Sequence, residues 1–269
     1  VGRRAARGRP AVYRKAAVLG CTLAIAVDSV DASGDDGDKD KDKDKDKDDA
    51  PPLRVTSIFF QEFEGLSNPT PDHPVQHAYG NTYIEERLGD CTFRISPGAF
   101  FQVTTEGAEA LYDEVADRVR DAAGGDRDRM KETLLLDVCC GTGTIGLYCM
   151  KKGVAGRVVG VDVAEPAIRD AAVNAGANGF EDEGVARFVA SRAEHALSAE
   201  LKRIDRKVPV VAVVDPAREG LNSAVIRTLR SHEKIRTVVY VSCNPTGSFV
   251  GDAGLLCGPP TKRYGGAPF

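Results

Sequence analysis

The sequence predicts an α/β protein built on a doubly wound parallel sheet, and two observations support this prediction. Short, almost wholly apolar runs recur between residues 134 and 242 and alternate with segments of helical length. This pattern is typical of buried parallel strands joined by crossover helices. The first run leads into a turn containing Gly141, Gly143 and Gly146. A glycine turn between a strand and a helix lets a bare backbone approach a ligand at the helix N-terminus.

The first apolar run is the centre of the predicted sheet. Leu134–Val138 is too short for a helix and has polar flanks, so we expect a buried strand there. After the turn through Gly141 and Gly143, a helix should run from about Thr144 to Lys152, because Gly153 would stop it.

Four more strands and two helices continue the alternation. The expected strands are Arg157–Asp162, Ala186–Ala190, Val208–Asp215 and Thr237–Ser242, and the expected helices are Glu165–Ala177 and Ala193–Arg206. Parallel strands present their carboxyl ends at one edge of the sheet, where such sheets bind ligands. Asp162, Asp215 and Cys243 are therefore expected at that edge.

Asp162 lies about 20 residues beyond the glycine turn, at the end of the second strand. An acid in this place can accept hydrogen bonds from both hydroxyls of a ribose. Dinucleotides and S-adenosylmethionine are both bound in this way. The residues alone leave three alternatives open: either of these two ligands, or a turn that only packs a helix on a sheet. Taken alone, Gln102 is an ordinary loop residue, and Cys139 and Cys140 are small residues beside the turn.

Cys243 is the strongest candidate for chemistry. A free cysteine is usually just a small buried hydrophobe, but this one directly follows the last expected strand, within Val241–Pro245. The thiolate form of cysteine is a nucleophile. A thiolate here would face a ligand bound beside the glycine turn.

The first hundred residues predict a different kind of structure. Strands are expected at Cys21–Val27, Leu53–Phe60, Asn81–Leu88 and Cys91–Ile95, followed by a helix at Glu106–Ala122 that Thr105 would cap. Between the first two strands, Asp28–Asp49 holds eleven Asp and five Lys. This low-complexity tract is too polar to bury.

Composition excludes some classes and leaves others open. The acidic tract carries a net charge of −6, so the rest of the chain carries +2, because the whole has −4. Charge therefore argues neither for nor against a nucleic-acid partner. No apolar run reaches the ~18 residues of a membrane span. The seven cysteines are odd in number and contain no CxxC pair, which disfavours disulfides and metal sites and favours a reducing, intracellular compartment, either cytosol or nucleus.

Four blocks together resemble the RNA uracil-5-methyltransferases, and among them the animal tRNA (uracil-5-)-methyltransferases. They are Phe93–Val103, Leu136–Leu147, Val214–Leu221 and Tyr240–Pro245. The resemblance extends from about Leu53 to Phe269. It implies a Rossmann-like class I methyltransferase domain at residues 104–269, C-terminally incomplete. A small mixed α/β central domain would occupy residues 53–103, with a remnant at 1–30 and the acidic linker at 31–52 between them.

The resemblance also implies roles for single residues. Gln102, Cys139, Gly141, Gly143, Asp162 and Asp215 would bind S-adenosylmethionine, and Cys243 would attack carbon 6 of a uracil. Arg218 and Asn244 are assigned to the substrate, expected to be tRNA. A monomer without metal is expected.

Three departures from the family pattern keep alternatives open. Ala217 replaces the second proline of an Asp-Pro-Pro-Arg motif. The family's proton-abstracting Glu would lie beyond Phe269, and the N-terminal RNA-binding module of animal relatives is missing. A catalytically inactive protein that binds cofactor or RNA is therefore the main alternative. A cytosine methyltransferase and a dinucleotide oxidoreductase are less favoured, because the last two blocks do not fit them.

Overall fold

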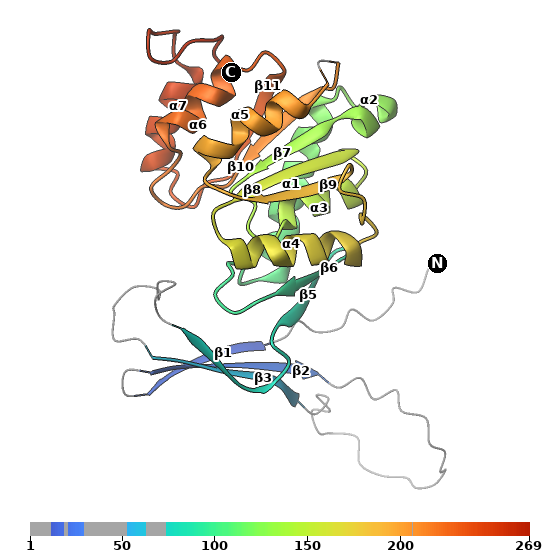
Figure 1. Ribbon diagram of the computed structural model, residues 1–269, viewed down its shortest axis with the longest axis vertical. Helices are drawn as coiled ribbons and strands as arrows, with labels where there is room; N and C mark the ends of the chain where they lie inside the picture. Colours follow the sequence, from blue (N-terminus) through green and yellow to red (C-terminus); the bar gives the residue numbers. More distant parts are fainter. Residues whose placement is uncertain (1–11, 19–20, 30–52, 63–73, 206) are drawn as a thin grey trace, which may run out of the picture. The chain divides into compact units, whose positions relative to one another are not determined.

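The computed structural model of the protein describes residues 12–18, 21–29, 53–62, 74–205 and 207–269. The chain divides into two compact units, Val1–Glu86 and Arg87–Phe269 (Figure 1). In the described ranges, no helix is long and apolar enough to cross a membrane. The acidic tract at 31–52 lies outside the described residues.

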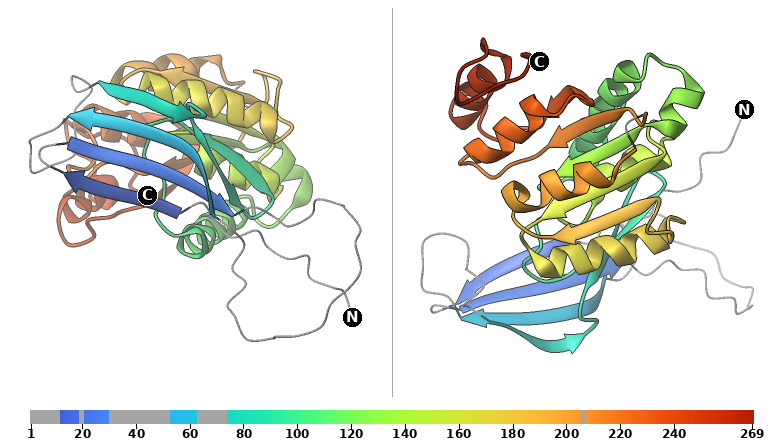
Figure 2. Two further views of the ribbon diagram at one scale, coloured as in Figure 1. Left: turned by 90° about the horizontal axis from the view of Figure 1, so that it is seen from below. Right: turned by 45° about the horizontal axis from the view of Figure 1, so that its top comes forward.

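The described part of the first unit is an antiparallel sheet. Its strands run in the order β1-β2-β3-β4, and the left view of Figure 2 shows the four strands side by side. Their bounds are β1 Val12–Val18, β2 Cys21–Ser29, β3 Leu53–Glu62 and β4 Val75–Gly80. The predicted strands at Cys21 and Leu53 are confirmed. Strands β1 and β4 were not predicted, and every residue of β4 is exposed, so β4 has no apolar alternation to recognise.

The second unit contains the predicted parallel sheet. Its strands are β7 Leu134–Val138, β8 Arg157–Asp162, β9 Ala186–Ala190, β10 Val210–Val214 and β11 Ile235–Tyr240. They run parallel in the order β11-β10-β7-β8-β9. The chain builds outward from β7 first to one side and then to the other. The carboxyl ends of β7 and β10 therefore flank the point where strand order reverses, the usual ligand site of doubly wound sheets.

Helices cover both faces of this sheet (Figures 1 and 2). Leu135 of β7 packs in one apolar cluster with α1 Thr105–Ala122, α3 Thr144–Lys151 and α4 Glu165–Ala177. Its neighbours Leu134 and Leu136 pack in a second cluster with α5 Ala193–Arg203 and α6 Ser223–Ser231. The remaining helices are α2 Arg127–Glu132 and α7 Ser248–Cys257. All five residues of β7 are buried, which explains why four of them are apolar. The fifth, Asp137, accepts a hydrogen bond from the Gly146 amide.

Several predicted boundaries shift in the structure. Helix α1 begins at Thr105, and Thr104 occupies the N-cap position without a side-chain cap, so Thr105 is not the cap. The fourth and fifth expected strands are shorter or displaced, at Val210–Val214 and Ile235–Tyr240. Helices α2, α6 and α7 were not predicted.

The structure also divides the chain earlier than the sequence analysis did. The second unit starts at Arg87 and so includes β6 Cys91–Ile95, which forms a two-stranded sheet with β5 Ile84–Leu88. Strand β6 belongs there because buried side chains of α4 bind its backbone, as at Arg94 and Asn174. The expected division lay between residues 103 and 104.

Truncating a side chain at the centre of the sheet should destabilise the second unit. Leu136 is fully buried, so Leu136→Ala should lower the free energy of unfolding by about 3 kcal/mol. Urea unfolding followed by far-ultraviolet circular dichroism measures this change, because every helix of the described residues lies in the second unit. Val173→Ala, on the exposed side of α4, should cost about 0.5 kcal/mol or less. Equal losses in the two variants would contradict this assignment of the core.

Candidate active site

The glycine turn after β7 has three glycines with three different environments. Gly141 has φ +53° and open space where a side chain would start. A methyl group on Gly143, at φ +77°, would lie 2.9 Å from the Phe188 ring, and one on Gly146 would lie 2.6 Å from Val158 Cγ2. The last two glycines thus allow close packing of α3 on the sheet. Gly141 leaves its backbone open to a ligand.

The residues before Gly141 hold the turn against β8. The backbone amides of Cys139 and Cys140 both donate to the Val161 carbonyl, at 2.9 and 3.2 Å. Cys139 has φ +64°, a left-handed conformation that side-chain-bearing residues rarely adopt. Burial raises the pKa of the Cys139 thiol to about 12 and that of Cys140 well above its usual range. Both thiols are therefore protonated at neutral pH and are poor nucleophiles.

Asp162 organises the same turn from the end of β8. Its Oδ2 accepts a hydrogen bond from the Gly141 amide at 2.9 Å, and its Oδ1 accepts one from the Ala164 amide at 2.8 Å. A carboxylate has about four acceptor positions, so each oxygen can still accept another hydrogen bond. This geometry fits an acid that holds a pair of ribose hydroxyls beside the open backbone of Gly141.

A small cavity of about 30 Å³ lies at the carboxyl end of β7. It is lined by Phe100, Phe101, Tyr112, Cys139, Cys140, Gly141, Thr142, Thr144, Ile145 and Asp215. Three residues predicted to bind cofactor are thus brought together: Cys139, Gly141 and Asp215. Burial raises the pKa of Asp215 to about 6.

Gln102 does not line this cavity, but its side chain lies near Tyr112, which does. The Tyr112 hydroxyl lies 3.2 Å from Thr144 Oγ1. The sequence analysis missed Tyr112 and Thr144. Tyr112 is one of several apolar or aromatic residues on the inner side of α1, so nothing in the sequence separates it from an ordinary core residue.

Cys243 lies on the loop after β11 and is exposed, unlike Cys139 and Cys140. The Asn244 amide on this loop donates to Ser242 Oγ at 3.1 Å, and the Asn244 side chain donates to the Arg218 carbonyl at 3.4 Å. The two residues assigned to the substrate from the sequence, Arg218 and Asn244, are therefore in contact. The small cavity is not lined by Arg218 or Asn244, and it is not lined by Cys243 or Asp162 either.

One carboxylate of α7 joins the two loops that follow β10 and β11. Asp252 Oδ2 accepts hydrogen bonds from the Tyr240 hydroxyl at 2.6 Å and from the Leu221 amide at 2.7 Å. Tyr240 ends β11, just before Cys243, and Leu221 closes the segment that begins at Asp215. The buried Asp252 side chain thus fixes both loops to one helix.

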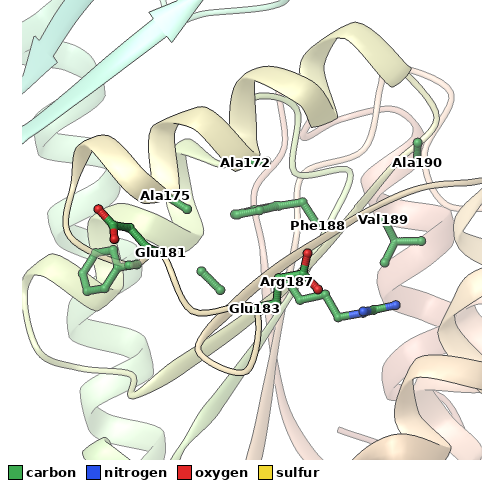
Figure 3. Close-up of a pocket in the computed structure, with 10 residues that line it drawn as sticks. Ala172, Ala175, Glu181, Glu183, Arg187, Phe188, Val189 and Ala190 are labelled. Atoms are coloured by element: carbon green, nitrogen blue, oxygen red, sulfur yellow. The ribbon is translucent and has the colours of Figure 1, made fainter.

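A larger cavity of about 410 Å³ lies away from these residues, between α4 and the edge strand β9. Figure 3 shows Ala172 and Ala175 of α4 on one side, with Phe188 and Arg187 of β9 opposite. None of the predicted site residues lines it. In the part of the chain that the structure describes, no group of His, Cys, Asp or Glu side chains could hold a metal ion.

The order of the strands and the glycine turn at the reversal point define a Rossmann-like fold of the class I methyltransferase type. The tRNA (uracil-54, C5)-methyltransferase of Pyrococcus abyssi, solved with S-adenosyl-L-homocysteine, is similar with a TM-score of 0.56 and 27% identity, over 75% of this chain and 44% of that one. The sequence matches the model of the tRNA (Uracil-5-)-methyltransferase family over residues 83–249. The chain belongs to this family, and the resemblance drawn from the four blocks is confirmed.

Two curated human proteins show the same relationship. tRNA (uracil-5-)-methyltransferase homolog A and homolog B are each 39% identical to this chain over 80% of its length. The chain spans 32% of the first and 40% of the second.

The buried carboxyl of Asp137 should make stability depend on pH. Burial and, to a smaller extent, the charges of Asp215 and Asp162 raise its pKa to about 7, although Oδ2 accepts a hydrogen bond from the Gly146 amide at 2.9 Å. Oδ1 has no hydrogen-bond partner among the described residues. Because the folded protein binds this proton more tightly than the unfolded chain, the resulting stabilisation is complete below about pH 4 and is lost as the pH rises through 7.

Asp137→Asn removes this titration while keeping an acceptor for Gly146. The free energy of unfolding of the wild type should therefore fall relative to the variant between about pH 4 and 7, by at most ~1.4 kcal/mol per pH unit. Urea unfolding at a series of pH values measures the difference, and Asp215 titrates in both proteins. Parallel curves for the two proteins would show that Asp137 does not titrate in this range.

Proposed function

We propose that this protein uses S-adenosylmethionine to methylate carbon 5 of a uridine in tRNA, through a covalent bond between Cys243 and the uracil. The observation that carries the proposal is the position of Cys243. It is exposed, follows β11, and lies at the same edge of the sheet as the glycine turn and Asp215. The family match and the relatives' names support tRNA as the substrate.

The residues at the turn fit S-adenosylmethionine. Asp162 retains acceptor positions for the two ribose hydroxyls, and Gly141 leaves room for close approach. Asp215, which lines the small cavity, and Gln102 are proposed to bind the polar amino-acid part. When bound, the cofactor supplies the methyl group.

Cys243 supplies what the uracil ring lacks. Carbon 5 of uracil is a weak nucleophile. Addition of the Cys243 thiolate to carbon 6 forms a carbon–sulfur bond and moves the ring electrons towards carbon 5, which can then take the methyl group. Removal of the carbon 5 proton by a base returns the electrons and expels the thiolate. The target base must leave its stack to reach the cysteine. Arg218 and Asn244, on the two joined loops, are proposed to bind the RNA.

This function places the protein inside the cell, in the cytosol or nucleus, and we propose that it acts as a monomer. The second candidate is a catalytically inactive protein that binds cofactor or RNA. It is favoured by Ala217, which replaces the second proline of the family's Asp-Pro-Pro-Arg motif. Formation of a covalent adduct with RNA separates the two candidates, because only the methyltransferase forms one.

The covalent step is tested with tRNA that carries 5-fluorouridine in place of uridine. Fluorine at carbon 5 cannot leave as a proton would, so the protein should remain attached to the RNA as a slow band on a denaturing gel. The band should require S-adenosylmethionine and disappear in Cys243→Ser. Cys257→Ser is the matched control, because Cys257 is also exposed. Absence of the band from folded protein, or its persistence in Cys243→Ser, would rule out the proposed nucleophile.

The cofactor site is tested by placing a methyl group on Gly141. Gly141→Ala should weaken S-adenosylmethionine binding by at least about tenfold, because the methyl group would occupy the open space at the turn. It should also cost about 1 kcal/mol of stability, the strain of a left-handed backbone. Gly153→Ala is the control. Gly153 has φ +70° and open surroundings too, but it follows the far end of α3.

Isothermal titration calorimetry and urea unfolding of both variants provide the measurements. Similar stability losses are expected, with weakened binding only in Gly141→Ala. Unchanged binding in that variant would remove Gly141 from the cofactor site.

A further inference from the structure

Helix α4 buries a stripe of polar residues. Asp170, Asn174 and Asn178 are spaced four residues apart and are 2, 0 and 5% exposed. Residues with this spacing share one face of a helix, and a polar face usually points to solvent. Here it lies against β6, so each polar group needs a partner there.

The partners are backbone groups of alternate residues, Thr92 and Arg94 in β6 and Ser96 directly after it. Asn178 Oδ1 accepts from the Thr92 amide at 3.0 Å, and its Nδ2 donates to the Thr92 carbonyl at 2.8 Å. Asn174 repeats the arrangement at Arg94, accepting at 2.6 Å and donating at 3.1 Å. Asp170 accepts from the Ser96 amide at 2.6 Å. We name this set of contacts the α4–β6 ladder.

The α4–β6 ladder forms because two residues of the strand and four residues of the helix advance by nearly the same distance. Two residues of a strand rise by about 6.7 Å, and four residues of a helix rise by about 6 Å. Side chains of α4 can therefore replace a neighbouring strand along β6. The ladder also sets where the chain enters the cofactor site, because Ser96 starts the loop that carries Phe100, Phe101 and Gln102.

Asn174 makes one contact that Asn178 does not. Its Nδ2 also donates to the Thr142 carbonyl at 3.1 Å, in the glycine turn between Gly141 and Gly143. The amide of the same peptide unit, Gly143 N, donates to the Cys140 carbonyl at 2.8 Å. Both ends of the Thr142–Gly143 peptide are thus held. Because glycine accepts either sign of φ, this peptide could otherwise turn over.

We propose that Asn174 is a positioning residue for the cofactor site. It fixes the orientation of the glycine turn relative to β6, through one fully buried amide that binds both. Strand β6 in turn leads into the loop with Phe100 and Gln102. The effect on cofactor affinity rests on the proposed function. The effect on the turn itself does not.

Asn178→Ala is the matched control for Asn174→Ala. Both residues are buried, and each exchanges two hydrogen bonds with one residue of β6. Asn174 lies within α4, and Asn178 is its C-cap residue. The third bond of Asn178 goes to the Asn174 carbonyl within the helix, whereas that of Asn174 goes to the turn. The two variants should therefore lose similar thermal stability and differ at the turn.

The first measurement is amide hydrogen exchange without ligand. Asn174→Ala should exchange at least about tenfold faster over residues 139–147, and Asn178→Ala should match the wild type there. Equal rates in both variants would overturn the proposal. Asn174→Asp provides a second test if the alanine variant does not fold. It keeps the size and the acceptor for Arg94 but, when ionised, cannot donate to Thr142, so the same faster exchange is expected.

The second measurement is calorimetric binding of S-adenosyl-L-homocysteine. Asn174→Ala should raise the Kd by about tenfold relative to Asn178→Ala. Equal Kd values would mean that the turn contact does not serve binding. If the wild type does not bind this probe, the proposed function fails, and the exchange experiment still decides whether Asn174 positions the turn.

Discussion

The second unit depends on the close packing of α3 against the parallel sheet. The space between them leaves no room for side chains at the contact points. Gly146 faces Val158, and Phe188 fits over both Gly143 and Gly160. Because protein interiors are close-packed, a methyl group at these glycines would push helix and sheet apart. The approach brings the Gly146 amide to the buried carboxylate of Asp137. It also places the N-terminus of α3 beside the strand ends where the candidate site lies.

Burial divides the cysteines of the site into two kinds. Cys139 and Cys140 are enclosed at the turn, and the desolvation of their thiolates raises their pKa values. They therefore serve packing and backbone geometry. Cys243 is exposed on a loop that Asn244 connects to Arg218. The same fold thus keeps two thiols inert next to the small cavity and presents a third one to solvent at the same edge of the sheet.

The parallel sheet was the part of the structure that the sequence predicted best. Strands β8 and β9 and helix α4 match their predicted bounds, because both strands are short, mostly apolar runs in the sequence. Helices α6 and α7 follow loops without such a run and were missed.

The site was predicted in part, because strand ends can be located from sequence and side-chain contacts cannot. Asp215 and Gly141 reach one cavity through the sheet topology alone. The roles of Tyr112 and Asn174 depend on partners 32 residues away, at Thr144 and Thr142. A buried asparagine on α4 has the same sequence signature as one that faces water, so the ladder was invisible before the structure.

The double contact of Asp252 has a mechanical consequence. Tyr240 and Leu221 hydrogen-bond to the same oxygen of Asp252. Helix α7 and the two loops are therefore coupled through a single atom. A displacement of α7 would carry the Cys243 loop and the Asp215 loop in the same direction. The distance between thiol and acid would then change less than the distance of either from the glycine turn.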